Sequence, residues 1–289
     1  MLFSSRLCAQ DTYQSKFCGG EKIRANFSAP LIILVPGAGS VNENLFLGYI
    51  NVGEYFKEIS SVLKKLNIAH EILPSLNQGN DSVEQRVTQL RNKIAKHSKV
   101  FLIGHSLGGL VARLVLKDPL IARNVSGVLQ LSAVNRGTEV ADYLMAESKQ
   151  AVMLKKIAQV FGFDLNQKKY FTEISVENSE YWNQSKEELN GVPILSIAAE
   201  SSPRQLLREI PPFYLGNKII CQEQQKNSCP LTDGLISEAS QIWNTCLMKV
   251  QANHGSIIGK TLYPSSHQKF NAFFTFLVEQ LTRQGFITR

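Results

Sequence analysis

The stretch that decides the fold runs from Val100 to Gly109 and reads VFLIGHSLGG. Its first four residues are consecutive apolar residues, a pattern typical of a strand buried on both faces of a parallel sheet. The segment 110–116 that follows is predicted to be helical. A strand that passes into a helix through Gly-x-Ser-x-Gly puts the serine on a sharp turn, where side chains two residues to either side would collide. We therefore expect Ser106 to project from the end of a buried strand, with glycines at 104 and 108 because nothing larger fits.

Strand and helix patterns alternate on both sides of this stretch. Apolar runs predict further strands at 31–35, 68–73, 125–131, 192–198 and 246–250, and helical spacing predicts helices at 52–66, 82–94 and 270–281. Such alternation predicts an α/β fold, with a mostly parallel sheet and helices on both faces. Residues 1–28 are polar and predicted to be irregular, so the expected domain covers residues 29–289. A long segment intervenes after Gly137 where one crossover helix would suffice, and it predicts a cap or lid inserted at about 138–190.

Composition and charge narrow the class of protein. The chain has 289 residues, of which 44% are hydrophobic and 19% charged, so it can bury a sizeable core and is not globally disordered. The net charge is +7 but the charges are scattered, which indicates no nucleic-acid partner and only a weak attraction to anionic surfaces such as phospholipid. No apolar stretch reaches the length of about 18 residues that a membrane helix needs. The first eight residues lack the apolar core of a complete signal peptide, so the protein is expected either to have lost its export information or to stay inside the cell.

Five cysteines lie in two groups, at 8 and 18 and at 221, 229 and 246. The grouping predicts two local disulfides and one free thiol, which favours a secreted or periplasmic location. Buried free thiols are the alternative. A metal site is disfavoured, because the chain has no Cys-x-x-Cys pair and the histidine nearest to the second group is His254.

Ser106 can act as a nucleophile if a nearby base takes its proton, and the alternative is a glycine turn with a structural role. His254 lies in Ala-Asn-His-Gly directly after the last predicted strand, where a loop can bring its imidazole over the edge of the sheet. We predict His254 as the base, with His267 at the start of the closing helix as its rival. The remaining histidines are expected to lie elsewhere: His70, His97 and His105.

The acid of such a triad lies between the serine and the histidine in the sequence. Asp233, in Leu-Thr-Asp-Gly-Leu-Ile, is the predicted acid, and Glu200 is its rival. Its task is to hold the imidazole in the tautomer that accepts the serine proton, and to stabilise the imidazolium that then forms.

The segment Pro36–Gly39 reads PGAG and follows the first predicted strand at the carboxyl edge of the sheet, where ligands of such folds collect. We predict that the backbone amides of Ala38 and Leu107 form an oxyanion hole, a pair of donors for the negatively charged oxygen of the transition state. A phosphate-binding loop is the alternative, and the absence of Gly-Lys-Ser/Thr disfavours it.

Four stretches occur in a fixed order, GHSLGG at 104–109, NRGTEVAD at 135–142, DGLI at 233–236 and NH at 253–254. In this order, over about residues 30–282, they resemble the landmarks of the secreted bacterial triacylglycerol lipases related to lactonising lipases, which have the α/β-hydrolase fold. The resemblance implies Ser106 as nucleophile, Asp233 as acid, His254 as base, a lid over the site and esters of long-chain acids as substrates. It implies a serine hydrolase that forms an acyl-enzyme and needs no organic cofactor.

Three departures from that family indicate a distant relative. The oxyanion loop has Pro36-Gly37 where the family usually has His-Gly. Many members carry a calcium-binding Asp two residues after the base, whereas this chain has Ser256, so we expect no calcium site. The cysteine spacing also differs from the single bridge that the family usually has near the acid.

Residues 140–161 of the predicted insertion keep apolar residues at near-helical spacing, with charged residues on the other side. An amphipathic helix over an active site either opens at a lipid surface or stays packed on the core, so a moving lid and a static cap both remain open. The same serine chemistry serves phospholipases A, lysophospholipases and acyltransferases, which are the alternatives to a lipase. An inactive lipid-binding relative and an intracellular thioesterase are further alternatives.

Overall fold

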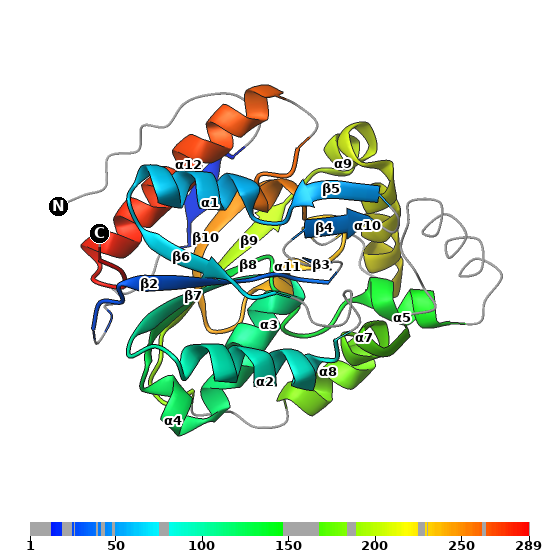
Figure 1. Cartoon of the computed structure of the whole chain (residues 1–289). Helices are drawn as coiled ribbons and strands as arrows, with labels where there is room; N and C mark the ends of the chain where they lie inside the picture. The colour runs from blue at the N-terminus through cyan, green and yellow to red at the C-terminus, as the bar shows by residue number, and fades with distance from the viewer. Residues whose placement is uncertain are drawn as a thin grey trace.

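The computed structural model of the chain describes residues 13–18, 25, 27–38, 40–41, 44–47, 50–74, 81–146, 168–183, 189–224, 229, 231–261 and 264–288. Seven strands form its central sheet in the order β1-β10-β9-β8-β7-β2-β6 (Figure 1). Their bounds are β1 Ser15–Phe17, β2 Leu31–Val35, β6 Ala69–Ile72, β7 Val100–His105, β8 Val125–Leu131, β9 Ile194–Glu200 and β10 Thr245–Gln251. All pairs are parallel except β1 with β10, so the predicted α/β fold with a mostly parallel sheet is confirmed.

Helices cover both faces of this sheet (Figure 1). One face carries α1 Lys57–Lys65 and α12 Pro264–Arg283, and the other carries α2 Val83–Ile94 and α3 Leu107–Leu114. Each face has its own apolar core, in which helix residues pack on the strands. Strand β7 is buried along its whole length, because neighbouring strands cover both its edges and helices both its faces. Two short elements, η1 Val115–Lys117 and α4 Pro119–Ala122, connect α3 to β8.

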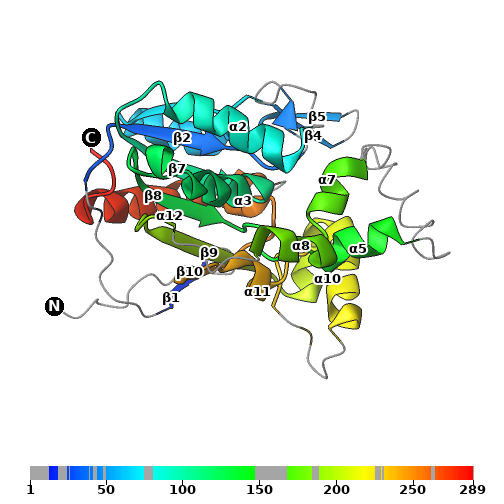
Figure 2. The ribbon, with the colours of Figure 1, turned by 90° about the horizontal axis from the view of Figure 1, so that it is seen from below.

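A second group of helices gathers at one end of the sheet (Figure 2). Three of them belong to the segment predicted as the cap, α5 Glu139–Met145, α7 Lys168–Glu173 and α8 Val176–Asn183. Two more follow β9, α9 Pro203–Glu209 and α10 Pro211–Glu223, and α10 contacts α5. The amphipathic helix predicted over 140–161 coincides with α5 as far as Met145, and its residues 147–161 lie outside the described part of the chain. The last short elements are α11 Glu238–Gln241 and η2 Ser256–Ile258.

A small antiparallel sheet lies between β2 and α1 in the sequence, and its strands are β3 Ser40–Val41, β4 Asn44–Leu47 and β5 Ile50–Glu54. The predicted start of the helix at 52–66 is wrong, because α1 begins only at Lys57. Residues 50–54 instead pair with 44–47, and Gly53 has φ +88°, which no α-helix accommodates.

The N-terminal segment also differs from its prediction as irregular. Its strand β1 pairs with β10, and the N–H of Tyr13 donates to the carbonyl of Gln251 at 3.0 Å. The segment covers the edge of β10, which would otherwise present unpaired backbone groups. All three side chains of β1 are exposed, so this strand carries no apolar run by which the sequence would reveal it. Among the described helices, none is long and apolar enough to cross a membrane.

Candidate active site

Ser106 stands on the turn between the end of β7 at His105 and the start of α3 at Leu107. Its backbone has φ 55° and ψ −127°, a strained conformation for a residue with a side chain. A Cβ on Gly104 would lie 2.5 Å from the carbonyl oxygen of Gly108, and a Cβ on Gly108 would lie 2.0 Å from that of Val35. Close backbone approach therefore requires both glycines, as the motif predicts.

Asp233 and His254 form a hydrogen-bonded pair. Nδ1 of His254 lies 2.7 Å from Oδ2 of Asp233, and the backbone N–H of His254 donates to the carbonyl oxygen of Asp233 at 2.9 Å. The second carboxylate oxygen accepts the N–H groups of Leu235 and Ile236 at 2.9 and 2.8 Å. These donors satisfy a carboxylate that is fully buried, as a buried charge requires. In the neutral ring Nδ1 then carries the proton, which leaves the lone pair on Nε2 to accept one.

The loop around His254 is built by the polar side chains of its neighbours. The Ser256 hydroxyl accepts the N–H of Asn253 at 2.8 Å, and Oδ1 of Asn253 accepts the N–H groups of Gly255 and Ser256 at 3.0 and 2.9 Å. The carbonyl of Ser256 accepts the Tyr13 hydroxyl at 2.7 Å, so the N-terminal segment also holds this loop. Ser256, which stands at the position of the family's calcium ligand, is thus used inside the loop.

The predicted oxyanion loop lies against the serine turn. A Cβ on Gly37 would lie 2.8 Å from the Cβ of Ser106. The N–H of Gly37 donates to the Tyr55 hydroxyl at 3.0 Å, so the next amide, that of Ala38, is the one proposed as a donor. The carbonyl of Pro36 accepts Nη1 of the buried Arg86 at 2.7 Å. On the other side, Leu107 is the first residue of α3, and the first amides of a helix have no partner within it.

Comparison with known proteins identifies the fold. Residues 70–206 match the family model described as the PGAP1-like alpha/beta domain. The mature lipase BlEst2 of Bacillus licheniformis is similar with a TM-score of 0.63 and 14% identity, over 94% of this chain and 99% of that one. The chain has the α/β-hydrolase fold. Lipase 1 of Pelosinus fermentans (TM-score 0.54, 13% identity, 89% and 99% covered) and EstA of Clostridium botulinum (0.54, 15%, 89% of both chains) share this fold. No curated protein sequence matches the chain.

In this fold the rivals of the predicted acid and base have other partners. Lys249 pairs with Glu238 and lies 3.6 Å from Glu200, and burial raises the pKa of Glu200. His267 faces a carboxylate on α1, that of Glu58, at 3.7 Å. The structure therefore brings Asp233 and His254 together, and places Glu200 and His267 with other partners.

Two disulfides form among the described cysteines of the chain, Cys18–Cys246 and Cys221–Cys229. The prediction of disulfides is confirmed, and Cys221–Cys229 is a local bridge as expected. The prediction of a second local bridge is wrong, because the pairing of β1 with β10 brings Cys18 to Cys246 across 228 residues. Cys8 lies outside the described residues. No group of three or more metal-ligating side chains occurs in the part of the chain that the structure describes.

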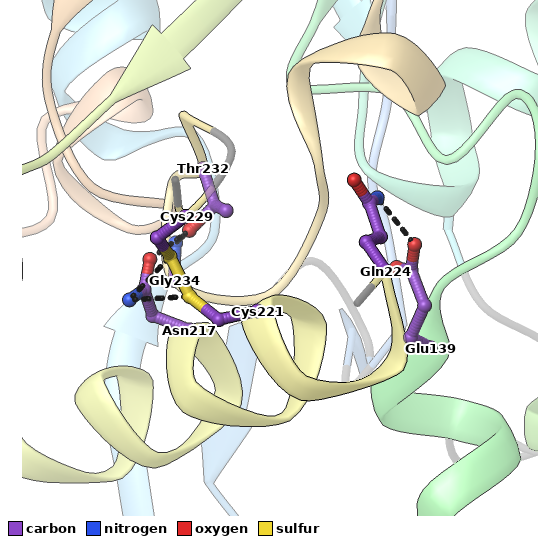
Figure 3. The surroundings of a disulfide bond; sticks show 7 residues. All are labelled: Glu139, Asn217, Cys221, Gln224, Cys229, Thr232 and Gly234. Atoms are coloured by element: carbon purple, nitrogen blue, oxygen red, sulfur yellow. Dashed lines mark hydrogen bonds between the residues drawn. A yellow bond between two sulfur atoms is a disulfide. The ribbon is translucent and has the colours of Figure 1, made fainter. Parts of the chain in front are cut away.

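Figure 3 shows how the Cys221–Cys229 bridge lies beside the loop that carries Asp233. The side-chain amide of Asn217 on α10 lies 3.5 and 3.6 Å from the two sulfur atoms. Its carbonyl oxygen accepts the Thr232 hydroxyl at 2.8 Å, and that hydroxyl accepts the N–H of Gly234 at 2.9 Å. The residues on both sides of Asp233 are therefore anchored to the middle of α10. At the C-terminal end of α10, Gln224 donates to Glu139 at 2.7 Å and so ties α10 to α5.

Two residues that the sequence did not assign to the site, Tyr55 and His105, lie within it. The Tyr55 hydroxyl lies 2.7 Å from Nδ1 of His105, and Nε2 of His105 lies 2.9 Å from the carbonyl oxygen of His254. His105 is visible in the sequence as the residue before Ser106. Nothing in the spacing of Tyr55 marks it, because its partners Gly37 and His105 lie 18 and 50 residues away.

Proposed function

We propose that the chain is a serine carboxylic-ester hydrolase that acts on lipid esters, with Ser106 as nucleophile, His254 as base and Asp233 as acid. One observation carries the proposal. The buried carboxylate of Asp233 is hydrogen-bonded to the imidazole of His254 at 2.7 Å. The backbone carbonyl of His254 is in turn hydrogen-bonded to His105, which directly precedes the strained Ser106. This arrangement supports acyl transfer through a covalent intermediate.

The first half-reaction acylates the serine. The Ser106 oxygen attacks the ester carbonyl carbon while Nε2 of His254 takes the hydroxyl proton, and the carbonyl electron pair moves onto its oxygen. The amides of Ala38 and Leu107 stabilise that oxyanion, and each such donor typically contributes about 2.7–4 kcal/mol. When the carbonyl reforms, the bond to the alcohol oxygen breaks and the alcohol leaves with the proton held by His254.

The second half-reaction releases the acid. Water attacks the acyl-enzyme while His254 takes its proton, and the oxyanion again binds to the two amides. The carbonyl reforms, the bond to the Ser106 oxygen breaks, and that oxygen recovers the proton. Every proton is carried by His254, so the proposed cycle needs no metal ion and no organic cofactor. Asp233 stays ionised and balances the charge of the imidazolium.

Further observations support the lipid part of the proposal. Lipases and esterases with the same fold support an ester hydrolase. The helices α5, α7 and α10 stand at the end of the sheet as a cap would, and the net charge of +7 weakly favours an anionic lipid surface as partner. The two disulfides favour export to an oxidising compartment.

Hydrolysis of p-nitrophenyl esters of long-chain and short-chain acids tests both parts. We expect faster hydrolysis of the long-chain esters, and a loss of about six orders of magnitude in turnover for Ser106→Ala, judged from a serine protease. Ser126→Ala is the matched control, because Ser126 is a buried serine on β8 whose hydroxyl donates to the carbonyls of Val100 and Phe286. Unchanged activity in Ser106→Ala would refute the nucleophile, and a preference for short-chain esters would refute the lipid substrate.

A fluorophosphonate probe separates an enzyme from an inactive relative. We expect the probe to label the wild-type chain at Ser106, which peptide mass spectrometry would locate, and to leave Ser106→Ala unlabelled. A wild-type chain that resists labelling would support a lipid-binding protein on the hydrolase fold instead.

A further inference from the structure

Two buried side chains outside the proposed triad connect three parts of the site. The N–H of Gly37 donates to the Tyr55 hydroxyl at 3.0 Å, that hydroxyl lies 2.7 Å from Nδ1 of His105, and Nε2 of His105 lies 2.9 Å from the carbonyl oxygen of His254. Tyr55 is 2% and His105 3% exposed. The bonds therefore run from the oxyanion loop, through the residue before Ser106, to the loop of the base, with water excluded.

The chemistry of the partners fixes which atom donates in each of these three hydrogen bonds. A backbone carbonyl accepts only, so Nε2 of His105 carries a proton and donates it to His254. In the neutral ring Nδ1 then has no proton and accepts the hydroxyl proton of Tyr55. The Tyr55 oxygen in turn accepts the amide of Gly37. All donors and acceptors are satisfied only when both His105 and Tyr55 are neutral.

We propose that Tyr55 and His105 are positioning residues, which hold the amide of Ala38 and the imidazole of His254 at a fixed spacing on either side of Ser106. The inference rests on the proposed function, since it assigns Ala38 and His254 their roles. We call the hydrogen bonds from Gly37 through Tyr55 and His105 to His254 the Tyr55–His105 relay. It acts through two backbone groups, the amide of Gly37, which precedes Ala38, and the carbonyl of His254. Neither side chain exchanges a proton with the substrate.

The surroundings keep both groups in the required form. Burial, and secondly the neighbouring His254, lower the pKa of His105 well below its usual value, and burial raises the pKa of Tyr55. The ring centroids of His105 and His254 lie 4.6 Å apart. A neutral His105 therefore leaves His254 free to become an imidazolium during the reaction without a like charge beside it.

The relay is tested by removing each of its bonds. Tyr55→Phe deletes the hydroxyl, His105→Leu deletes both ring nitrogens, and His105→Gln keeps an N–H that reaches toward the His254 carbonyl. We expect Tyr55→Phe and His105→Leu to lower kcat and kcat/KM equally, by about 10- to 100-fold, since displaced groups cost that much without changing substrate binding. His105→Gln is expected to restore most of the loss seen in His105→Leu. The double variant Tyr55→Phe/His105→Leu is expected to be no worse than the poorer single variant, because both break one relay.

Two controls separate positioning from simple stabilisation. Ser126→Ala removes a buried, hydrogen-bonded hydroxyl far from the site, and we expect it to lower the melting temperature while leaving kcat unchanged. If the relay variants lower only the melting temperature, or if their losses in kcat multiply in the double variant, the relay does not position the site.

A readout that needs no turnover keeps this test apart from the proposed function. The Nδ1 proton between His254 and Asp233 gives a downfield proton NMR signal, which we expect to shift or broaden in Tyr55→Phe and His105→Leu but not in Ser126→Ala. A changed signal in a chain that hydrolyses no ester would overturn the proposed function and leave the relay standing. An unchanged signal together with unchanged kcat would overturn the relay alone.

Discussion

The two halves of the site are held in place by opposite means. In the nucleophile half, residues 36–38 and 104–109, backbones approach so closely that a Cβ on Gly37, Gly104 or Gly108 would lie within 2.8 Å of another atom. In the acid–base half, residues 231–236 and 253–256, side chains supply the hydrogen bonds that shape each loop. The first half is thus shaped by close backbone packing, and the second mainly by hydrogen bonds from polar side chains. Gly234 is the exception in the second half, since it has φ +100° and a Cβ there would lie 2.6 Å from the Cβ of Phe213.

This difference decides how each half fails. Tightly packed backbone has no room for an added carbon, and at Gly104 and Gly108 the atoms that it would meet are main-chain atoms that cannot rotate away. A loop shaped by polar side chains tolerates added volume at its surface but not the loss or exchange of a bonded atom. The nucleophile half should therefore respond in stability to a methyl group, and the acid–base half should respond in activity to a change of one atom.

Within the acid–base half, the largest effect is expected from Asp233→Asn. The new carboxamide oxygen can keep the bonds to Leu235 and Ile236, so its NH2 group faces Nδ1 of His254 and donates to it. The imidazole must then carry its proton on Nε2 and cannot accept one from Ser106. We expect kcat to fall by about 10⁴, the loss known for the same exchange in a serine protease, with an unchanged melting temperature.

Glu200→Gln serves as the control for that exchange, since Glu200 is the rival acid and lies near Lys249 instead. It should leave kcat close to that of the wild type. If Glu200→Gln lost more activity than Asp233→Asn, the assignment of the acid would be wrong.

In the nucleophile half, the largest effect on stability is expected from Gly108→Ala. The added Cβ would lie 2.0 Å from the carbonyl oxygen of Val35 and 2.7 Å from that of Pro36, so β2 and α3 would have to separate. We expect the free energy of unfolding in urea to fall by about 3 kcal/mol or more, at the upper end for overpacked cores. A variant as stable as the wild type would show that the close approach is not needed.

The nucleophile half is also the part that the sequence predicts best, and for the same reason. A position with no room for a Cβ must be glycine, so Gly104 and Gly108 around Ser106 indicate the turn without any knowledge of the fold. The buried strand 31–35 is equally plain, because a strand covered on both faces is apolar at nearly every position, and 125–131 is recognisable despite its Ser126 and Gln130. In the acid–base half the sequence indicates Asp233 and His254 by their order only, and indicates none of the bonds that shape their loops.

The long-range bonds to these loops are hidden because the fold, and not a local sequence pattern, brings the partners together. Thr232 contacts Asn217 on a helix that no strong periodicity reveals, and Ser256 contacts Tyr13 from a segment expected to be irregular. Cys18 reaches Cys246 by a strand whose side chains are exposed. A local signal does exist for α9 and α10, since Pro203 and Pro211 stand at their first positions, where proline is favoured.

His105 joins the two halves, and its protonation predicts how stability depends on pH. Its pKa in the folded chain lies well below the usual value of 6.5, because the ring is buried. Below about pH 6.5 the unfolded chain binds a proton at His105 that the folded chain does not, so stability falls as the pH falls, by at most about 1.4 kcal/mol per pH unit. Above that pH the contribution is constant. Tyr55 and His254 are the titratable groups that contact the ring.

Urea unfolding of the wild type and of His105→Gln at pH 7.5 and pH 5.5 measures this contribution. We expect the difference in stability between the two pH values to be smaller in the variant, whereas His97→Gln controls for the loss of a histidine outside the site. Equal pH dependence in the wild type and His105→Gln would mean that His105 takes up its proton in the folded chain as readily as in the unfolded one.

The smallest effect is expected from Gly255→Ala, the counterpart of Gly108→Ala. Gly255 directly follows His254, so in the sequence it looks as essential as the glycines around Ser106. Its φ is −84°, however, and a Cβ there would meet its nearest atom, the carbonyl oxygen of Lys260, at 3.5 Å, an ordinary contact. The N–H that donates to Asn253 is retained in alanine.

For Gly255→Ala we expect stability to change by less than about 0.5 kcal/mol and kcat to stay near that of the wild type. The reason is that the loop is shaped by Asn253 and Ser256 and not by the missing side chain. A loss as large as that of Gly108→Ala, measured by the same urea titration, would mean that both halves are held by close packing and that the contrast between them is false.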